Sequence, residues 1–419
     1  MKVILQSVTV IDLTSAHHLK VVDIFIQDNL IKEIGKKLSV AGAKTLDCKG
    51  QYVSNGWIDL HVNFCDPGFE TKEDILSGLN AAAKGGFVGV ALMPNTQPAL
   101  KSKSEIEYIN NKSNSHAVTI YPIGCLSANR EGKDLAEMYD MKLAGAKAFS
   151  DGNAAVQDAG LMSRAMLYAK GIDSLIISKP EDKNIAQNAQ MNEGQMSTLL
   201  GMKGNPSLAE ELMVSRDIFL AEYQDAKVHF TCITSAKSVE LIKAAKKKGL
   251  KVTADVSINH LYFDDTMLET FDTNFKLSPP LRTKEDIKAL KQGLKEGTID
   301  AICSQHTPED IEHKQVEFEY AKEGMIGLQT AFSLALMTLE KQMDLSDIIA
   351  KFTIAPRAIL GLPVQSIAVN QVASLTLFDP NATWKFQSSE NVSRSKNSAL
   401  FNQALKGKVI SIINNNQLK

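Results

Sequence analysis

The sequence lacks three features that would place it in a specialised class of protein. Its formal net charge is only -2, so no strong field of either sign indicates binding to nucleic acid or to a membrane surface. No apolar run approaches the roughly 18 residues needed to span a bilayer, and the first residues lack the apolar stretch of a secretory signal. The five cysteines are scattered and form no Cys-x-x-Cys pair. We therefore expect a reduced, cytoplasmic protein.

The chain is long enough, at 419 residues, for one large domain and a smaller one. Residues 1–55 contain short strand-like runs separated by turns. From residue 56 to about 360, short apolar strands alternate with amphipathic helices in about eight units, which predicts an α/β fold of the (β/α)₈ barrel type. Residues 361–419 return to strands, and we expect them to pack with residues 1–55 as a small composite β-sandwich. Strands are expected within the barrel at 87–93, 118–124, 146–149, 174–178, 228–233, 251–256 and 299–303.

The stretch 55–70 organises the rest of the chain. Residues 58–64 read as a short strand, and Asp66-Pro67-Gly68 after it is typical of a turn. His61 and Asn63 therefore leave one face of the strand, two residues apart. A His-x-His pair in this place would bind a metal ion, but the second position is Asn, a poor zinc ligand.

The other barrel strands also end in polar side chains, at the edge where barrel enzymes carry their active sites. Asn95 can donate to and accept from a ligand, and Asp151 could serve as a metal ligand or a general base. Taken alone, both residues are also ordinary turn chemistry. Cys232 is the only soft ligand expected at these strand ends, although a Cys flanked by apolar residues is more often part of a core. His229 and His306 could be ligands or packed, hydrogen-bonded side chains.

Three segments together resemble the dihydroorotase family of the amidohydrolase superfamily. Residues 56–70 resemble its Gly-Phe-Ile-Asp-x-His-x-His-x-Arg-Asp-Pro-Gly signature. Residues 81–98 are similar to its Ala-Ala-x-x-Gly-Gly-Phe-Thr…Met-Pro-Asn-Thr-x-Pro run, and residues 276–282 to its Lys-x-Asn-Pro-Pro-Leu-Arg loop. The resemblance implies a zinc-dependent barrel with a composite β-sandwich, a homodimer, and action on dihydroorotate and carbamoyl aspartate in pyrimidine synthesis.

When the family's functional positions are compared with this sequence one residue at a time, few of them carry the family's side chain. His61 matches the first metal-binding His, Asp151 the metal-bridging carboxylate and Asn95 the substrate-contacting Asn. The remaining positions carry other residues: Asn63, Lys179 and Cys232 replace metal-binding His residues, Cys65 a substrate-binding Arg, Ser278 a substrate-loop Asn, Gln305 the catalytic Asp and Glu309 the final His of its motif.

These replacements predict that dihydroorotase chemistry is lost. The family's nucleophile is a metal-bound hydroxide, and a catalytic zinc ion usually needs three protein ligands. Gln305 cannot take a proton from that water or return one to the leaving nitrogen. With Cys65 in place of Arg, the paired grip on a substrate carboxylate is absent as well. We expect no bound cofactor.

Three hypotheses remain open from the sequence. The first is a non-catalytic homologue that helps to assemble aspartate carbamoyltransferase, the partner that the resemblance implies for inactive members. The second is an enzyme with a rebuilt metal site drawn from His61, Asp151, Cys232, His306 and Glu309. The third is an anion binder that uses Asn95 and Lys179, unless Lys179 merely neutralises Asp151 or Glu181.

Overall fold

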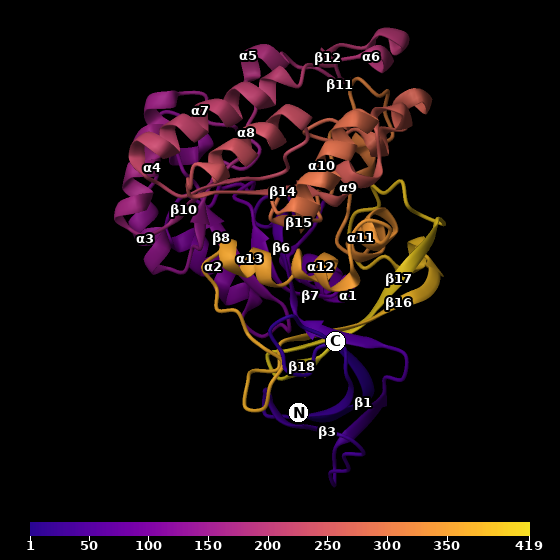
Figure 1. The fold of residues 1–419 in the computed structure, drawn as a ribbon. Helices are drawn as coiled ribbons and strands as arrows, with labels where there is room; N and C mark the ends of the chain where they lie inside the picture. Colours follow the sequence, from indigo (N-terminus) through magenta and orange to yellow (C-terminus); the bar gives the residue numbers. More distant parts are fainter.

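The computed structural model describes all 419 residues as a parallel barrel above a curled sheet (Figure 1). Eight parallel strands form the barrel in the order β15-β14-β13-β10-β9-β8-β7-β6. The α/β barrel predicted from the alternation of strands and helices is confirmed. The barrel strands are β6 (Trp57–Val62), β7 (Phe87–Leu92), β8 (Thr119–Gly124), β9 (Ala148–Phe149), β10 (Leu175–Ser178), β13 (Val228–Phe230), β14 (Val252–Ser257) and β15 (Ala301–Cys303).

The seam between the first and last barrel strands is the weakest part of the closure. No ladder joins β15 to β6; a single bridge pairs Val62 with His306. The backbone N–H of Asn63 donates to the carbonyl of His306 over 2.9 Å. The buried carboxylate of Asp59 accepts the N–H of Ser304 over 3.0 Å. Side chains that lie across this seam therefore contribute to closing the barrel.

Helices cover the outside of the barrel, and their ends follow recognisable sequence signals. The helix α1 begins after Asp74, whose carboxylate accepts the N–H of Ser77. The helix α10 begins with a Thr283–Asp286 capping box and ends at Gly297 in the left-handed conformation. The helices are α1 (Ile75–Lys84), α2 (Lys103–Ser113), α3 (Met138–Leu143), α4 (Ala159–Gly171), α7 (Leu208–Gln224), α8 (Ala236–Lys247), α9 (Ile258–Tyr262), α10 (Lys284–Glu296), α11 (Ala331–Leu339), α12 (Leu345–Ala350) and α13 (Ile354–Ile359).

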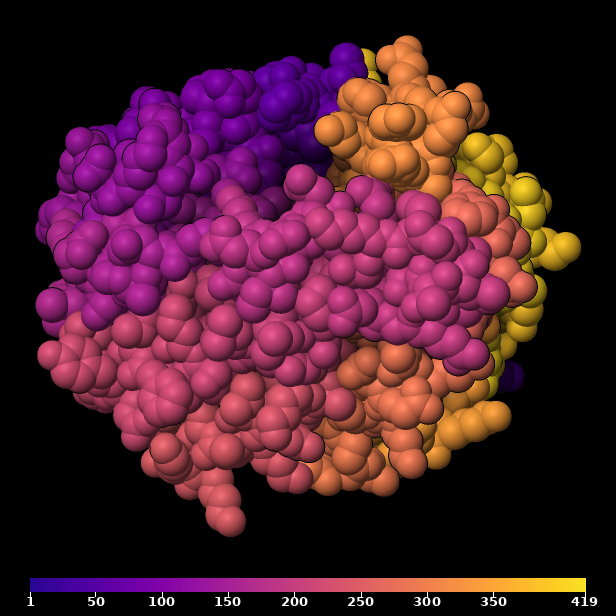
Figure 2. All heavy atoms as spheres, turned by 90° about the horizontal axis from the view of Figure 1, so that it is seen from above, coloured from indigo at the N-terminus to yellow at the C-terminus, as the bar shows by residue number.

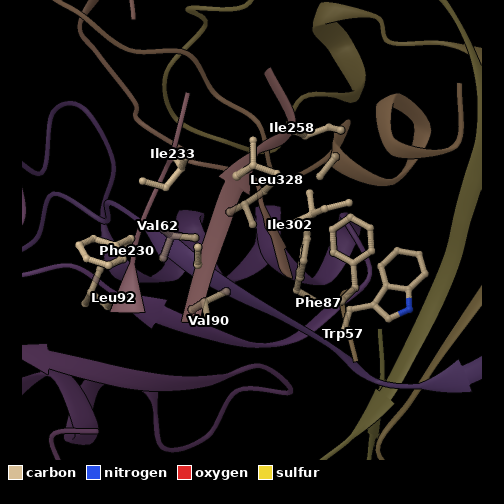
Figure 3. Packing of buried hydrophobic residues seen from close by; sticks show 14 of the residues in the cluster. Trp57, Val62, Phe87, Val90, Leu92, Phe230, Ile233, Ile258, Ile302 and Leu328 are labelled. Carbon is tan, nitrogen blue, oxygen red and sulfur yellow. The ribbon is translucent and has the colours of Figure 1, made fainter. Parts of the chain in front are cut away.

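Both ends of the chain enter one eight-stranded sheet below the barrel. Its strands are β1 (Lys2–Ile11), β2 (Val21–Gln27), β3 (Leu30–Gly35), β4 (Lys44–Asp47), β5 (Tyr52–Asn55), β16 (Leu375–Lys385), β17 (Ala404–Asn414) and β18 (Gln417–Leu418). The long strands β16 and β17 continue past the sheet to lie beside α11 (Figure 1). Trp57, which is fully buried, packs where barrel and sheet meet, against Phe87, Phe332, Phe352 and Phe378. Figure 3 shows Trp57 and Phe87 side by side at this end of the barrel core.

The segment after β10 departs from the pattern of alternating strands and helices. It forms α5 (Lys183–Ala186), β11 (Met191–Asn192), α6 (Gln195–Leu200) and β12 (Gly204–Asn205), with β11 and β12 paired in a separate two-stranded sheet. Viewed from above, magenta atoms cross the end of the barrel, and a hollow lies between them and the indigo and orange parts (Figure 2). None of the helices is both long and apolar enough to cross a lipid bilayer.

Candidate functional site

Polar side chains gather at the carboxyl ends of the barrel strands, as the sequence predicts. They lie at or within three residues of a strand end: His61 on β6, Asn63 after it, Asn95 after β7, Asp151 after β9, Lys179 after β10, Cys232 after β13 and Gln305 after β15. We call Asn63, Asn95, Asp151, Lys179, Ser278 and Gln305 the mouth set. Further ionisable side chains lie beneath the mouth set, in the interior of the barrel, and they are described after it.

The two asparagines of the mouth set bond to the protein itself. The amide of Asn63 donates to Thr307 Oγ1 over 3.0 Å. Its carbonyl oxygen accepts from Asn95 Nδ2 over 2.6 Å. The side-chain oxygen of Asn95 in turn accepts the backbone N–H of Asn153 over 3.0 Å. Asn95 is therefore tied to the position where the family has a second metal-binding His.

Lys179 is a buried cation without a carboxylate partner. It is only 4% exposed, and its ammonium donates to Ser278 Oγ over 2.8 Å. Asp151 and Glu181 bond elsewhere, so the suggestion that Lys179 neutralises one of them is wrong. The amide of Gln305 donates to the carbonyl of Ser278 over 2.8 Å, while its Oε1 is buried without a partner.

We expect Lys179→Met to stabilise the fold. Burying an ammonium without a counter-charge costs free energy that one hydroxyl partner only partly offsets, so the substitution should raise the free energy of unfolding by about 1–2 kcal/mol. Urea unfolding of both proteins measures the difference. Lys112→Met is the matched control, because Lys112 pairs with the buried carboxylate of Asp66 at 2.8 Å and its loss should destabilise. A destabilised Lys179→Met protein would show that the ammonium has a stabilising partner.

Asp151 turns its carboxylate toward the neighbouring loop. One oxygen accepts the N–H groups of Leu126 (3.0 Å) and Ser127 (2.8 Å), and the other accepts the hydroxyl of Ser127. Burial raises the pKa of Asp151, opposed by these hydrogen bonds. Both oxygens are therefore already engaged by the protein.

The structure does not bring together the five residues expected for a rebuilt metal site. His306 lies between Glu73 (3.3 Å) and the N–H of Gly327. Glu309 pairs with Lys72 and His313. Of the five candidate ligands, only His61 and Cys232 lie in contact with each other. Cys65, which stands at the position of the family's substrate-binding Arg, is buried as well, and burial raises the pKa of its thiol to about 12.

A second set of ionisable side chains fills the interior of the barrel. His61, Cys232, Asp255 and Cys303, which we call the thiol cluster, are each 0–1% exposed. Cys232 Sγ lies 3.6 Å from His61 Nδ1 and 3.8 Å from Cys303 Sγ. Cys303 Sγ lies 3.5 Å from Asp255 Oδ1. The expectation that Cys232 is the only soft ligand at the strand ends is wrong, because Cys303 at the end of β15 lies beside it.

Hydrogen bonds fix the carboxylate of Asp255 at the centre of this cluster. Its Oδ1 accepts the N–H of Cys232 over 2.6 Å, and its Oδ2 lies 3.0 Å from His229 Nε2. Burial alone would raise the pKa of Asp255, but the hydrogen bond and charge of His229 hold it below its usual value. Burial likewise opposes ionisation of Cys232, yet the neighbouring Cys303 thiol and His61 lower its pKa to about 6. Asp255 and Cys232 thus favour their anionic forms despite complete burial.

The mouth set does not fit the zinc site that the family resemblance implies. Two amides, an ammonium and a carboxylate with both oxygens engaged stand where imidazoles and free carboxylates are needed. An ammonium in particular repels a metal cation.

The cavities at the mouth are small and are not lined by the inherited metal-binding positions. One, of about 270 Å³, is lined by residues that include Glu181, Gln190 and Ser278. Another, of about 30 Å³, is lined by residues that include Gln305 and Thr307. His61, Asn63, Asp151 and Cys232 line neither of them. A groove of about 840 Å³ lies elsewhere, between α10 and the α12–α13 region.

His260 makes the fold sensitive to acid. Its Nε2 lies 2.8 Å from the carbonyl of Pro279, its Nδ1 has no partner, and burial lowers its pKa from 6.5 to about 4. Below pH 6.5 the imidazole of His260 is protonated in the unfolded chain but stays neutral in the folded chain. The free energy of unfolding therefore falls as the pH drops toward 4. We expect a loss of about 2 kcal/mol by pH 5 from this group. Thermal melts of wild type and His260→Gln between pH 7 and 5 should converge if the imidazole is the cause; parallel curves would contradict it.

Sequence reasoning missed Asp255 and gave Cys303 no role. Asp255 lies within β14, in a strand buried on both faces, so no polar alternation marks it. Cys303 was expected only as the last residue of a strand. One signal in the sequence could have found both residues. Each is a polar or thiol side chain on a barrel strand, and a neighbouring barrel strand carries a candidate ligand at its end.

Comparison with known proteins agrees with this architecture. Residues 50–238 match the family described as Dihydro-orotase-like. The chain is 42% identical over 401 residues to a dihydroorotase of Ruminiclostridium cellulolyticum, covering 95% of this chain and 94% of that protein. It is 41% identical over 409 residues to one of Pelotomaculum thermopropionicum, covering 97% and 96%. Among solved structures, L-hydantoinase (dihydropyrimidinase) of Arthrobacter aurescens shares the fold, with a TM-score of 0.88 at 20% identity over 99% of this chain and 95% of that one. The chain belongs to the dihydroorotase family.

Proposed function

We propose that this chain is a non-catalytic member of the dihydroorotase family that serves pyrimidine synthesis as a structural partner of aspartate carbamoyltransferase. The observation that carries the first part is the hydrogen bonding of the mouth set. Asn63, Lys179 and Gln305 occupy inherited metal and base positions, and each bonds to a neighbouring residue of the protein. Substrate and metal would have to displace those bonds and then face the ammonium of Lys179.

Retention of the fold supports a role for the surface of the protein. The barrel, the composite sheet and the loop 276–282 are all formed, with Arg282 buried and bonded to Asn192 and the carbonyl of Asn205. A chain that keeps its full architecture while its mouth lacks the reactive groups is suited to binding another protein. The five cysteines are all buried and free, which supports the cytoplasm as its location.

Co-expression with aspartate carbamoyltransferase of the same organism tests the partnership. Size-exclusion chromatography of the mixture should give a single complex larger than either protein, and the transferase should be less stable or less active without this chain. A dihydroorotase from a relative, such as that of Ruminiclostridium cellulolyticum, is the matched control for non-specific association. If the two proteins elute separately at micromolar concentration, the partnership is refuted. The loss of catalysis is tested independently, by measuring turnover of dihydroorotate.

A second candidate function is an active cyclic amidohydrolase with a rebuilt metal site. Two observations favour it: the curated relatives carry the name dihydroorotase, and His61 and Cys232 lie within contact of each other. If the chain is such an amidohydrolase, the substitution Asp151→Ala should abolish its activity. Unchanged turnover in that variant would exclude a site based on the family's carboxylate.

A further inference from the structure

Three neighbouring helices of the barrel turn large apolar side chains toward the outside. The helices α3, α4 and α7 lie along one flank of the barrel (Figure 1). Gln224 at the end of α7 donates to Ser163 of α4, and Lys142 of α3 donates to the carbonyl of Ile172 at the end of α4. Exposed large apolar residues stand on α4 and α7, and we call them the apolar flank: Leu167, Tyr168, Leu208, Leu212, Phe219 and Tyr223.

The apolar flank is larger than the patch that a monomer usually exposes. Its six residues are between 43% and 82% exposed, and Tyr139 and Leu143 of α3 extend it with similar exposure. An aromatic side chain offers about 150–250 Å² and a leucine somewhat less, so the whole surface is on the order of 800 Å². The largest apolar patch on a typical monomer is about 300–600 Å². About 800 Å² is also what each partner contributes to a stable interface of standard size.

Other barrel helices do not share this composition. The exposed residues of α8 are Ala244 and the charged Lys237, Glu240, Lys243 and Lys247. Those of α10 all carry charged or amide side chains. The apolar flank is therefore a local feature and not a general property of the outer layer of helices.

The apolar stripe on α7 is symmetric about its centre. The two inner residues, Leu212 and Phe219, lie equally far on either side of a point beside Ser215, and the two outer residues, Leu208 and Tyr223, do so as well. When two such helices pack antiparallel about a twofold axis at that point, each leucine of one copy meets an aromatic ring of the other. A twofold contact requires this self-complementary pattern. The small side chain at the centre lets the two helices approach closely.

The charged residues on the outward side of α7 need no partner from another protein. Each of them is hydrogen-bonded or ion-paired within the chain: Glu211 with Ser235, Arg216 with Asp217 and Glu222 with Lys248. Both signs of charge are present, so a second copy of the same face is not repelled. Covering the stripe therefore removes apolar area from water, which favours association, without leaving a charge unpaired.

We propose that the apolar flank is the contact face between two copies of this chain, with the two α7 helices antiparallel across a twofold axis near Ser215. The family resemblance implies a homodimer without naming its surface, and the exposed residues supply one. The inference goes beyond the proposed function, because it concerns contact between two copies and involves no transferase.

The mass of the full chain in solution is the first test. Light scattering after size-exclusion chromatography at micromolar concentration should give twice the chain mass of 45.8 kDa. Phe219→Lys places a charge against Leu212 of the other copy, and it should raise the dissociation constant of the dimer by about 100-fold, as loss of a central interface residue does. Tyr320→Lys is the matched control. Tyr320 is 71% exposed on a loop outside the three helices, so this substitution should leave the dimer unchanged.

A cross-link tests the geometry independently. Ser215→Cys puts a thiol beside the twofold axis, so a short bis-maleimide should join two copies covalently. The native cysteines are all buried and should not react. Lys243→Cys, on the outward side of α8, should give no cross-linked dimer. If Phe219→Lys fails to fold, the cross-link decides alone.

Three results would overturn the proposal. The first is a monomer at micromolar concentration. The second is a dimer that survives Phe219→Lys or that Ser215→Cys does not cross-link, because the copies then meet through another surface. The third is loss of a complex with aspartate carbamoyltransferase in Phe219→Lys without any change in the chain's own mass, which would assign the apolar flank to that partner. An intact dimer that elutes apart from the transferase would refute the partnership alone.

Discussion

The purified chain, supplied with excess zinc, should hydrolyse dihydroorotate no faster than buffer does. Hydrolysis in this family needs a metal-activated water and a base. Asn63, Lys179 and Gln305 supply neither, and Cys65, buried with its thiol pKa raised to about 12, cannot replace an Arg that binds a substrate carboxylate. The reverse reaction from carbamoyl aspartate should be absent for the same reason. An absorbance assay in both directions, with zinc, manganese and cobalt each tested, measures the expected result.

An active relative sets the scale of this experiment. The dihydroorotase of Ruminiclostridium cellulolyticum, 42% identical to this chain, should turn over under the same conditions. Turnover by this chain that vanishes in Asp151→Ala would contradict the non-catalytic function and establish the rebuilt enzyme. Turnover that survives Asp151→Ala would exclude a site based on the family's carboxylate, and repeating the assay after a second purification step would show whether a contaminating enzyme is its source.

The fold could be predicted from the sequence because its signals are local and repeated. Apolar strands alternate with capped helices. The sequence pattern of residues 283–296 predicts a helix, and α10 (Lys284–Glu296) begins one residue later. The turn at Asp28 and Asn29 is a tight one with both residues at positive φ, as Asp and Asn allow. Some boundaries were missed where strands are short: the expected strand 299–303 is paired only at Ala301–Cys303.

The segment 183–205 could not be predicted, because it does not follow the alternation of strands and helices in the barrel. Its strands β11 and β12 have two residues each, too few to show alternation. They are held by tertiary contacts: Arg282, far along the chain, bonds to Asn192 on β11 and to the carbonyl of Asn205 on β12. Order that depends on such a distant partner leaves no local pattern.

The candidate site was predicted in part, and for a physical reason. Strand ends of a barrel meet at one edge, so five members of the mouth set could be named from strand positions alone, while Ser278 was named from the family resemblance of the loop 276–282. The interior cluster depends on which way each side chain of a doubly buried strand points, and a run such as Val252–Ser257 does not reveal that. Cys303 and Asp255 thus became visible only as neighbours of Cys232.

Asp255→Ala should be among the most damaging single substitutions in the barrel. The carboxylate accepts the N–H of Cys232, lies 3.0 Å from His229 and 3.5 Å from the Cys303 thiol, and is fully buried. Removing it leaves the buried Nε2 of His229 and the buried backbone N–H of Cys232 without their partners. Loss of one member of a buried ionic pair costs about 3–5 kcal/mol, so the free energy of unfolding should fall by that amount. Urea unfolding of the wild type and the variant measures this loss.

The matched controls separate the buried network from the mere loss of a charge. Asp173→Ala removes a carboxylate whose side chain is 83% exposed and which pairs only with the exposed Lys227, so it should change stability by less than about 1 kcal/mol. Asp255→Asn retains an oxygen that can accept from Cys232, and it should cost less than Asp255→Ala. Equal, small losses for Asp255→Ala and Asp173→Ala would mean that the interior relaxes or admits water. In that case the cluster would not hold strands β6, β13, β14 and β15 together, and the closure of the barrel would have to depend on the apolar core around it.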